Sequence, residues 1–278
     1  MDWLPLGIDI AKGSFDVVLL TPDRSRHRRF DNTPAGFTAL ATWLAQQGAP
    51  HVQACLEATG TYGEALATFL ADAGHRVSGV NPKRIAPFAK SRLARAKTDK
   101  MDAGLIAAFC APERPALWQP PAPMYRHLQA LLRHRDDRER IQPQERNRLG
   151  AAVHPPAIQQ SLAAQLAYLD QALAAVEQLL REHLAAHPEL QAQRQLLLTI
   201  PGSGETTARW LLAELAGGTK FRRAAQAAAY AGLEPRIQQS GLWAGKKSRL
   251  RKQGNAYVRK ALYCPALTAR QARSTWKQ

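Results

Sequence analysis

Long apolar runs are missing from this sequence of 278 residues. No run approaches the roughly 18 residues of a membrane-spanning helix, and the N-terminus enters a strand-like pattern directly instead of a signal peptide. Cysteine is also scarce: Cys55, Cys110 and Cys264 are odd in number and widely spaced, without the pairing of a metal site. We therefore expect no membrane association, and buried, reduced cysteines in a cytoplasmic protein.

Acidic residues are few compared with basic ones. The chain has 22 Asp and Glu against 38 Lys and Arg, which gives a formal net charge of +16. This excess indicates a polyanionic partner, most often nucleic acid, because phosphate neutralisation dominates such binding. A membrane surface is the competing polyanion, and the missing apolar runs disfavour it. The length allows two domains, each with a core of its own.

The segment 97–103 places two carboxylates among lysines. Asp99 and Asp102 are three residues apart at the start of an apolar helical run, so both can lie on one helix face. Negative charge is also favoured at a helix N-terminus. Lys97 and Lys100 stand beside the pair, where a phosphate backbone can approach. The alternative interpretation is a charged helical turn with surface salt bridges.

The first hundred residues alternate between strand-like and helix-like patterns. Strands are predicted at 6–10, 15–20, 28–30, 52–56 and 76–80. Helices are predicted after Thr33, after Gly63 and from Asp99. Hairpin strands followed by strand–helix alternation predict a mixed sheet with flanking helices.

Two further acids are placed to meet the pair at 99 and 102. Asp9 stands inside an apolar strand, where a carboxylate is costly unless it is paired or binds a metal. Glu57 ends a strand expected beside the first one, and ligand sites in such sheets gather at the carboxyl ends of strands. Hard oxygen ligands of this kind suit Mg²⁺ or Mn²⁺. Two such ions about 3.5–4 Å apart can stabilise the attacking and leaving oxygens of a phosphodiester.

The composition changes after Pro120. Residues 125–148 are rich in arginine, and residues 161–184 form a helix whose apolar residues are spaced as in a coiled coil or bundle. Pro143 and the prolines at 155–156 predict a break into two helices.

A second, helical domain is predicted beyond this region. Gly202 and Gly204 lie between two helical segments, where free backbone N–H groups can bind phosphate, although an ordinary tight turn has the same pattern. Ser240 precedes a glycine, which is typical of a turn, and no histidine lies close to it in the sequence. A basic run follows, comprising Lys246, Lys247, Arg249, Arg251 and Lys252.

Together these motifs resemble the DEDD-type transposases of bacterial insertion sequences, whose recombination is guided by a bridge RNA. The matching segments occur in the family's order along nearly the whole chain: 7–12 (GIDIAK), 57–62 (EATGTY), 97–103 (KTDKMDA), 200–204 (IPGSG) and 239–241 (QSG).

The resemblance implies three parts. These are an α/β RNase H-like (RuvC-like) domain at 1–115, a helical coiled-coil linker at 116–190, and a mainly α-helical transposase domain at 191–278 with a helix-hairpin-helix-like element. The chain ends soon after the Ser240 region, so we expect a shortened last domain. By the same resemblance, Ser240 is the nucleophile, and the metal-binding catalytic acids are Asp9, Glu57, Asp99 and Asp102. Nucleic-acid contacts are expected from Lys97, Lys100, Gly202, Gly204 and the basic run.

The leading hypothesis is a Mg²⁺- or Mn²⁺-dependent DNA transposase, guided by RNA, that exchanges strands through a covalent serine–DNA intermediate. Its expected partners are donor and target DNA, a guide RNA, and further copies of the chain in a dimer or tetramer. Its expected location is the bacterial cytoplasm, at the nucleoid when bound to DNA.

Three alternatives stay open. One is a nuclease similar to Holliday-junction resolvases, in which metal-activated water attacks, and another is an inactive nucleic-acid-binding remnant. The third is an ATP-using protein similar to sugar kinases, because a Gly-Ile-Asp segment before a hairpin also opens that superfamily. The net charge and the lack of a second glycine-rich phosphate motif argue against the kinase.

Overall fold

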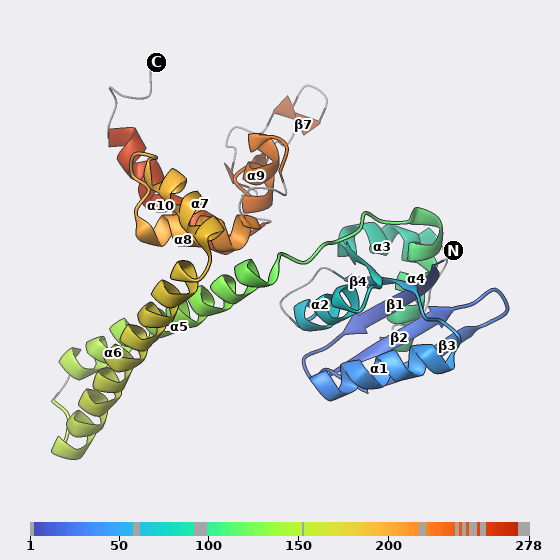
Figure 1. Ribbon diagram of the computed structural model, residues 1–278, viewed down its shortest axis with the longest axis horizontal. Helices are drawn as coiled ribbons and strands as arrows, with labels where there is room; N and C mark the ends of the chain where they lie inside the picture. The colour runs from blue at the N-terminus through green and yellow to red at the C-terminus, as the bar shows by residue number, and fades with distance from the viewer. Residues whose placement is uncertain are drawn as a thin grey trace. The chain divides into compact units, whose positions relative to one another are not determined.

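The structure is a computed structural model that describes residues 3–57, 62–91, 99–151, 153–216, 221–236, 239–240, 243–244, 249–250 and 254–271. The chain folds into two compact units, Met1–Pro120 and Pro121–Gln278, drawn in Figure 1. Each unit has a hydrophobic core of its own. In the part of the chain that is described, no helix combines the length and the apolar character needed to span a membrane.

A mixed five-stranded sheet forms the centre of the first unit. Its strand order is β3-β2-β1-β4-β5, with β2 antiparallel to both β1 and β3, and β4 parallel to both β1 and β5. The predicted hairpin and the strand–helix alternation are therefore confirmed. The strands are β1 (Leu4–Ile10), β2 (Ser14–Leu20), β3 (Ser25–Asp31), β4 (Val52–Glu57) and β5 (Arg76–Val80).

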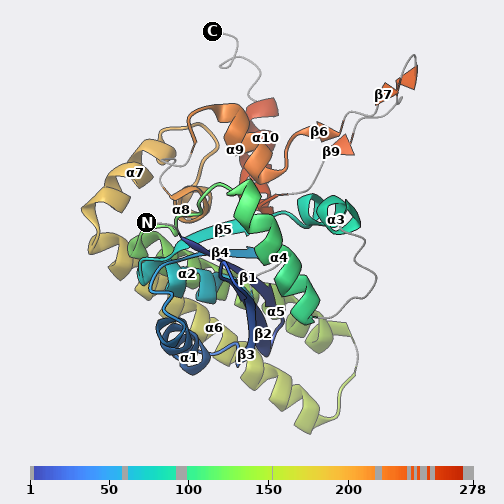
Figure 2. The same ribbon diagram turned by 90° about the vertical axis from the view of Figure 1, so that its right-hand side faces the viewer.

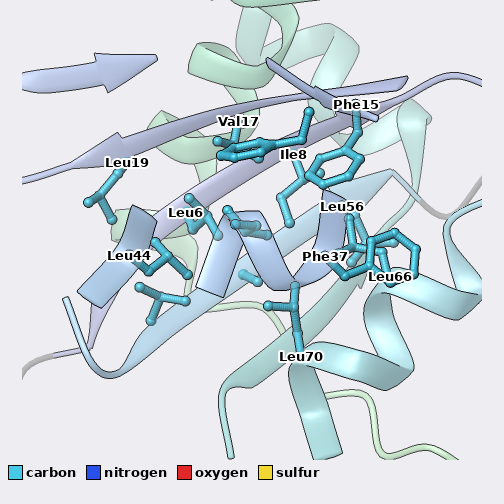
Figure 3. Close-up of a cluster of buried hydrophobic side chains, with 14 of the residues drawn as sticks. Leu6, Ile8, Phe15, Val17, Leu19, Phe37, Leu44, Leu56, Leu66 and Leu70 are labelled. Atoms are coloured by element: carbon cyan, nitrogen blue, oxygen red, sulfur yellow. The ribbon is translucent and has the colours of Figure 1, made fainter. Parts of the chain in front are cut away.

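Helices α1 (Pro34–Gln46) and α2 (Glu64–Asp72) cover one face of this sheet. Helix α1 begins where the sequence predicts, because the Thr33 side chain accepts a hydrogen bond from the Gly36 N–H at 3.2 Å. Alternate side chains of the central strands pack against both helices, as Figure 3 shows. The labelled core residues are Leu6, Ile8, Phe15, Val17, Leu19, Phe37, Leu44, Leu56, Leu66 and Leu70.

Helix α4 (Asp99–Glu113) crosses the opposite face of the sheet (Figure 2). It comes unusually close to β1 at Gly7. A Cβ atom built on Gly7 would lie 2.1 Å from the Ala103 carbonyl oxygen and 2.3 Å from the Ala107 nitrogen. Only glycine therefore permits the backbones of helix and strand to approach this closely.

The cysteines differ from the expectation. Cys55 in β4 and Cys110 in α4 are both buried and form a disulfide, with their Cα atoms 6.1 Å apart, and Cys264 is exposed. The prediction of buried cysteines is therefore confirmed for Cys55 and Cys110 and wrong for Cys264, whereas the prediction of reduced cysteines is wrong for the first two and confirmed for Cys264. The physical reason is that α4 packs on β4, which brings together two residues separated by 55 positions in the sequence. Helix α3 (Pro82–Ser91) joins the same buried cluster through Ile85.

Two long helices dominate the second unit (Figure 1). Helices α5 (Pro123–Ala151) and α6 (Pro156–Ala185) pack along each other. The chain breaks between them as predicted, but Pro143 lies inside α5 and does not end it. One proline removes a single helical hydrogen bond, at a cost of about 3 kcal/mol, and packing against α6 offsets that cost. The predicted stripe of α6 is buried or half-buried: Leu162, Leu166, Leu169, Leu173, Val176 and Leu180.

Shorter elements complete the second unit. The helices are α7 (Pro188–Leu198), α8 (Glu205–Leu215), α9 (Ala224–Ala231) and α10 (Ala256–Gln271). Four two-residue strands form two small ladders: β6 (Pro235–Arg236) with β9 (Arg249–Leu250), and β7 (Gln239–Ser240) with β8 (Trp243–Ala244).

A buried carboxylate ties three helices of this unit together. Glu214 in α8 accepts hydrogen bonds from Gln129 of α5 at 2.8 Å and from Asn255, just before α10, at 2.6 Å. Arg133 of α5 adds an ion pair to Glu214 at 3.3 Å. The Glu214 side chain is fully enclosed, so these partners replace the water that it loses on folding.

Candidate active site

Two acids stand side by side at the ends of neighbouring strands. β1 and β4 run parallel, with Ile8 opposite Leu56, and the next residues along the strands are Asp9 and Glu57. Residues on the same rung of adjacent strands point to the same face of a sheet, with their Cβ atoms about 5 Å apart. Both acids are half-buried. Asp9 and Glu57 therefore both follow the last β1–β4 pair at the carboxyl edge of the sheet, and their joint binding of a metal stays a prediction.

Both acids share the sheet face that α4 covers. Side chains alternate along a strand, so Asp9 lies on the same face as Gly7, which α4 touches. By the same alternation, Glu57 lies on the face of Cys55, which is bonded to Cys110 of α4. The opposite face belongs to the apolar core under α1 and α2.

The direction of α4 brings its first turn toward these acids. Ala103 lies over Gly7 in the middle of β1, whereas Ala111, near the end of the helix, lines a cavity together with Pro5 at the start of β1. The helix thus runs from the carboxyl edge of the strands toward their amino edge. Asp102, which is half-buried and directly precedes Ala103, belongs to the carboxyl-edge end of α4.

The fourth acid begins this helix. Asp99 is the first residue of α4, as predicted, although its side chain lies outside the described part of the structure, as does that of Lys100. Among the described residues, no three His, Cys, Asp or Glu side chains form a group able to hold a metal ion. The donors at this edge are carboxylate oxygens, which are the ligands that Mg²⁺ and Mn²⁺ prefer. Asp9, Glu57 and Asp102 are therefore not gathered into such a group in this structure, and what fits a divalent ion is their residue type.

Sequence reasoning missed an acid next to Asp9. Asp16 in β2 lies directly opposite Asp9 in the antiparallel ladder, on the same face, and is only 5% exposed. Its carboxylate pairs with His27 Nε2 at 2.6 Å and with Arg29 Nε at 3.8 Å, both from β3. The signal was available, because Asp16 stands in an apolar strand just as Asp9 does. Its two basic partners show that this carboxylate is satisfied within the sheet.

The glycine turn of the second unit joins α7 to α8. Gly202 has a left-handed φ of 83°, and a Cβ atom there would lie 3.0 Å from Thr268 of α10. Gly204 caps α8, and a Cβ atom there would meet nothing within 4 Å. Only Gly202 is therefore required by the geometry of the turn.

A carboxylate stands at the start of α8, where a phosphate would approach. Arg194 of α7 donates to both oxygens of Glu205, at 2.9 and 2.6 Å. Hydrogen bonds from Arg194, aided by the charges of Arg194 and Arg209, hold the pKa of Glu205 below its ordinary value. This acid is ionised at neutral pH, and its arginine partners offset its repulsion of an anion.

The predicted nucleophile and most of the basic run are described only in part. Ser240 ends β7 and pairs with Trp243 of β8, and its side chain lies outside the described residues. Arg249 begins β9 opposite Arg236, again with only its backbone described. The remaining predicted contacts lie outside the described residues altogether: Lys97, Lys246, Lys247, Arg251 and Lys252.

Comparison with known proteins gives two family matches, one in the N-terminal part and one in the C-terminal part of the chain. Residues 6–154 match a DEDD family of the IS110 group described as Transposase, and residues 194–278 match the family described as Transposase IS116/IS110/IS902 family. Two curated proteins are similar, each named Pilin gene-inverting protein, from Moraxella bovis and Moraxella lacunata. Each is 35% identical over 265 residues, which cover 94% of this chain and 81% of the relative.

Proposed function

Since the chain belongs to the IS116/IS110/IS902 transposase family and is a DNA transposase or recombinase, we propose a mechanism for its exchange of DNA strands. In this mechanism the protein uses divalent metal ions and a serine nucleophile. The observation that carries this proposal is that Asp9 and Glu57 each directly follow the last pair of the parallel β1–β4 ladder, on the sheet face covered by α4. The strand order and the parallel β1–β4–β5 arrangement support an RNase H-like domain of the RuvC type.

The acids of the first unit would hold the metal. Asp9, Glu57, Asp99 and Asp102 would bind one or two Mg²⁺ or Mn²⁺ ions. Bound ions of this kind neutralise charge on a phosphodiester and lower the pKa of an attacking hydroxyl. Asp16 is held by His27 and Arg29, so its charge is offset within the sheet.

Ser240 would supply the attacking oxygen. Its Oγ would bond to a DNA phosphorus atom and lose its proton, while the oxygen of the departing DNA strand leaves and gains one. The product is a phosphoserine diester, so one phosphate ester bond replaces another. The reverse attack by a hydroxyl of a different strand rejoins the DNA without ATP. No histidine lies near Ser240 in the sequence, so activation would come from a metal-bound environment.

The proposed binding partners are inferred from the net charge of the chain and from the names of its relatives. The net charge of +16 supports binding to donor and target DNA and to a guide RNA. Contacts would come from Lys97, Lys100, Gly202, Gly204 and the basic run. The similar Moraxella proteins are named for gene inversion, which joins two DNA sites, and we extend recombination between two sites to this chain.

The same proposal includes an oligomeric state and a division of the chain into three parts. The chain would work as a dimer or tetramer at the bacterial nucleoid. Its parts would be a catalytic domain at 1–115, a helical coiled-coil linker at 116–190, and a transposase domain at 191–278 in which α7 and α8 form a helix-hairpin-helix-like element.

Ser240→Ala tests the nucleophile. The purified protein would be incubated with Mg²⁺, guide RNA and a labelled DNA duplex, and then run on a denaturing gel. Wild-type protein should carry a labelled DNA strand, and Ser240→Ala should bind the duplex normally but carry none. Ser161→Ala, at an exposed position on α6, is the matched control and should behave as wild type. If Ser240→Ala still cuts the DNA and leaves a free end, water is the attacker and the enzyme is a nuclease.

A further inference from the structure

Asn32 bonds to the backbone beyond both acid-bearing strands. Its side-chain N–H₂ donates to the Ala11 carbonyl at 3.1 Å and to the Tyr62 carbonyl at 3.1 Å. Its backbone N–H donates to the Gly13 carbonyl, also at 3.1 Å. An asparagine amide has two N–H donors, so Asn32 commits one to each of two separate segments.

These two segments follow the two central acids. Ala11 comes two residues after Asp9 of β1, and Tyr62 comes five residues after Glu57 of β4. The register between β1 and β4 runs from Leu4 opposite Val52 to Ile8 opposite Leu56, so both acids lie just past its last pair. Asn32 therefore links the two chain segments where that pairing has ended.

Hydrogen bonds between these segments matter because the two acids carry like charges. Two carboxylates that follow the last pair of neighbouring strands are expected about 5 Å apart, and they repel each other when no cation lies between them. That repulsion favours separation of the strand ends beyond the last rung. The two hydrogen bonds from Asn32 oppose this separation, since moving the segments apart would break one of them.

We propose that Asn32 is a positioning residue that holds Asp9 and Glu57 at the separation that a divalent cation requires. The inference rests on the proposed metal site of the first unit. Asn32 touches neither the metal nor the DNA in this role. It acts through backbone carbonyls, in the way that groups behind metal ligands orient them in other proteins.

Metal binding by the full chain, measured without DNA, tests this role. Mn²⁺ would be titrated into wild type, Asn32→Ala and Asp9→Asn by calorimetry, at a temperature well below the melting temperature of each protein. We expect Asn32→Ala to bind Mn²⁺ about tenfold more weakly than wild type, since mutations behind metal ligands typically cost 10- to 100-fold. The Mg²⁺ concentration for half-maximal DNA cleavage should rise in parallel. Asn147→Ala, at an exposed position on α5, is the matched control and should bind as wild type.

A second variant covers the case in which Asn32→Ala does not fold. Asn32→Ser keeps one donor on a shorter side chain, and it should also bind Mn²⁺ more weakly than wild type. If Asp9→Asn loses Mn²⁺ binding while folded Asn32→Ala and Asn32→Ser both bind like wild type, the positioning role is overturned and the metal site stands. If Asp9→Asn binds Mn²⁺ as wild type does, the metal site itself is wrong, and the role of Asn32 falls with it.

Discussion

At the scale of single residues, Asp9 and Asp16 lie opposite each other on β1 and β2 but differ in burial, since Asp9 is half-buried and Asp16 is only 5% exposed. A carboxylate inside an apolar strand led to Asp9 but not to Asp16, although both stand in runs of the same kind. The Asp16 carboxylate pairs with His27 and Arg29 of β3. The register that sets Asp16 opposite Asp9 is fixed by the type and length of the short turn between β1 and β2, which strand periodicity alone does not give.

Substitutions of the two acids are predicted to have different effects on stability. Asp16→Asn should lower the free energy of unfolding by about 1 to 3 kcal/mol, because it removes a buried charge that two basic side chains need. Asp9→Asn should leave stability unchanged or raise it in metal-free buffer, because it removes one of several carboxylates that repel each other. Urea denaturation at pH 7 in the presence of a chelator measures both. Equal destabilisation by the two substitutions would contradict the expectation that repulsion among the acids dominates at Asp9.

At the scale of elements, the sequence predicted the strands and helices better than their contacts. The strand at 76–80 and the helices beginning at Pro34 and Asp99 were located from periodicity and capping. The pairing of Cys55 with Cys110 and the continuity of α5 through Pro143 were not foreseen. Both depend on packing between elements far apart in the chain, which local periodicity does not encode.

The contact between α4 and β1 gives the sharpest prediction at this scale. Gly7→Ala should lower the free energy of unfolding by about 3 kcal/mol or more, because its Cβ would overlap backbone atoms that cannot rotate away. It should also weaken Mn²⁺ binding, since α4 carries two of the proposed ligands. Thermal unfolding and calorimetry measure the two effects.

Gly104→Ala is the control within the same helix. Its added methyl group would find its nearest neighbour, a Val18 side-chain atom, at 3.9 Å. Alanine favours a helix interior over glycine by about 1 kcal/mol, so Gly104→Ala should be neutral or stabilising. If Gly7→Ala proved as harmless as Gly104→Ala, α4 would not lie against β1 as described.

At the scale of the whole molecule, net charge and the order of motifs were the most informative features of the sequence. They pointed to a nucleic-acid enzyme with an acidic site in its first part and a basic run in its last part, and the family matches agree with transposition. The contacts that the protein makes with DNA involve a second molecule. No pattern within one chain specifies those contacts.

The charge leads to a prediction about binding by the intact protein. Its affinity for duplex DNA, measured by fluorescence anisotropy from 50 to 300 mM KCl, should fall linearly on a log–log plot, with a slope of about −0.9 for each phosphate neutralised. Replacing both Lys246 and Lys247 with Ala should make the slope shallower by close to two such units if both contact phosphates. Chelation of divalent metal should leave the affinity nearly unchanged, because the basic side chains would supply most of it, whereas cleavage should stop. An affinity that did not respond to salt would contradict a phosphate-bound partner, and one abolished by chelation would assign DNA binding to the acidic site instead.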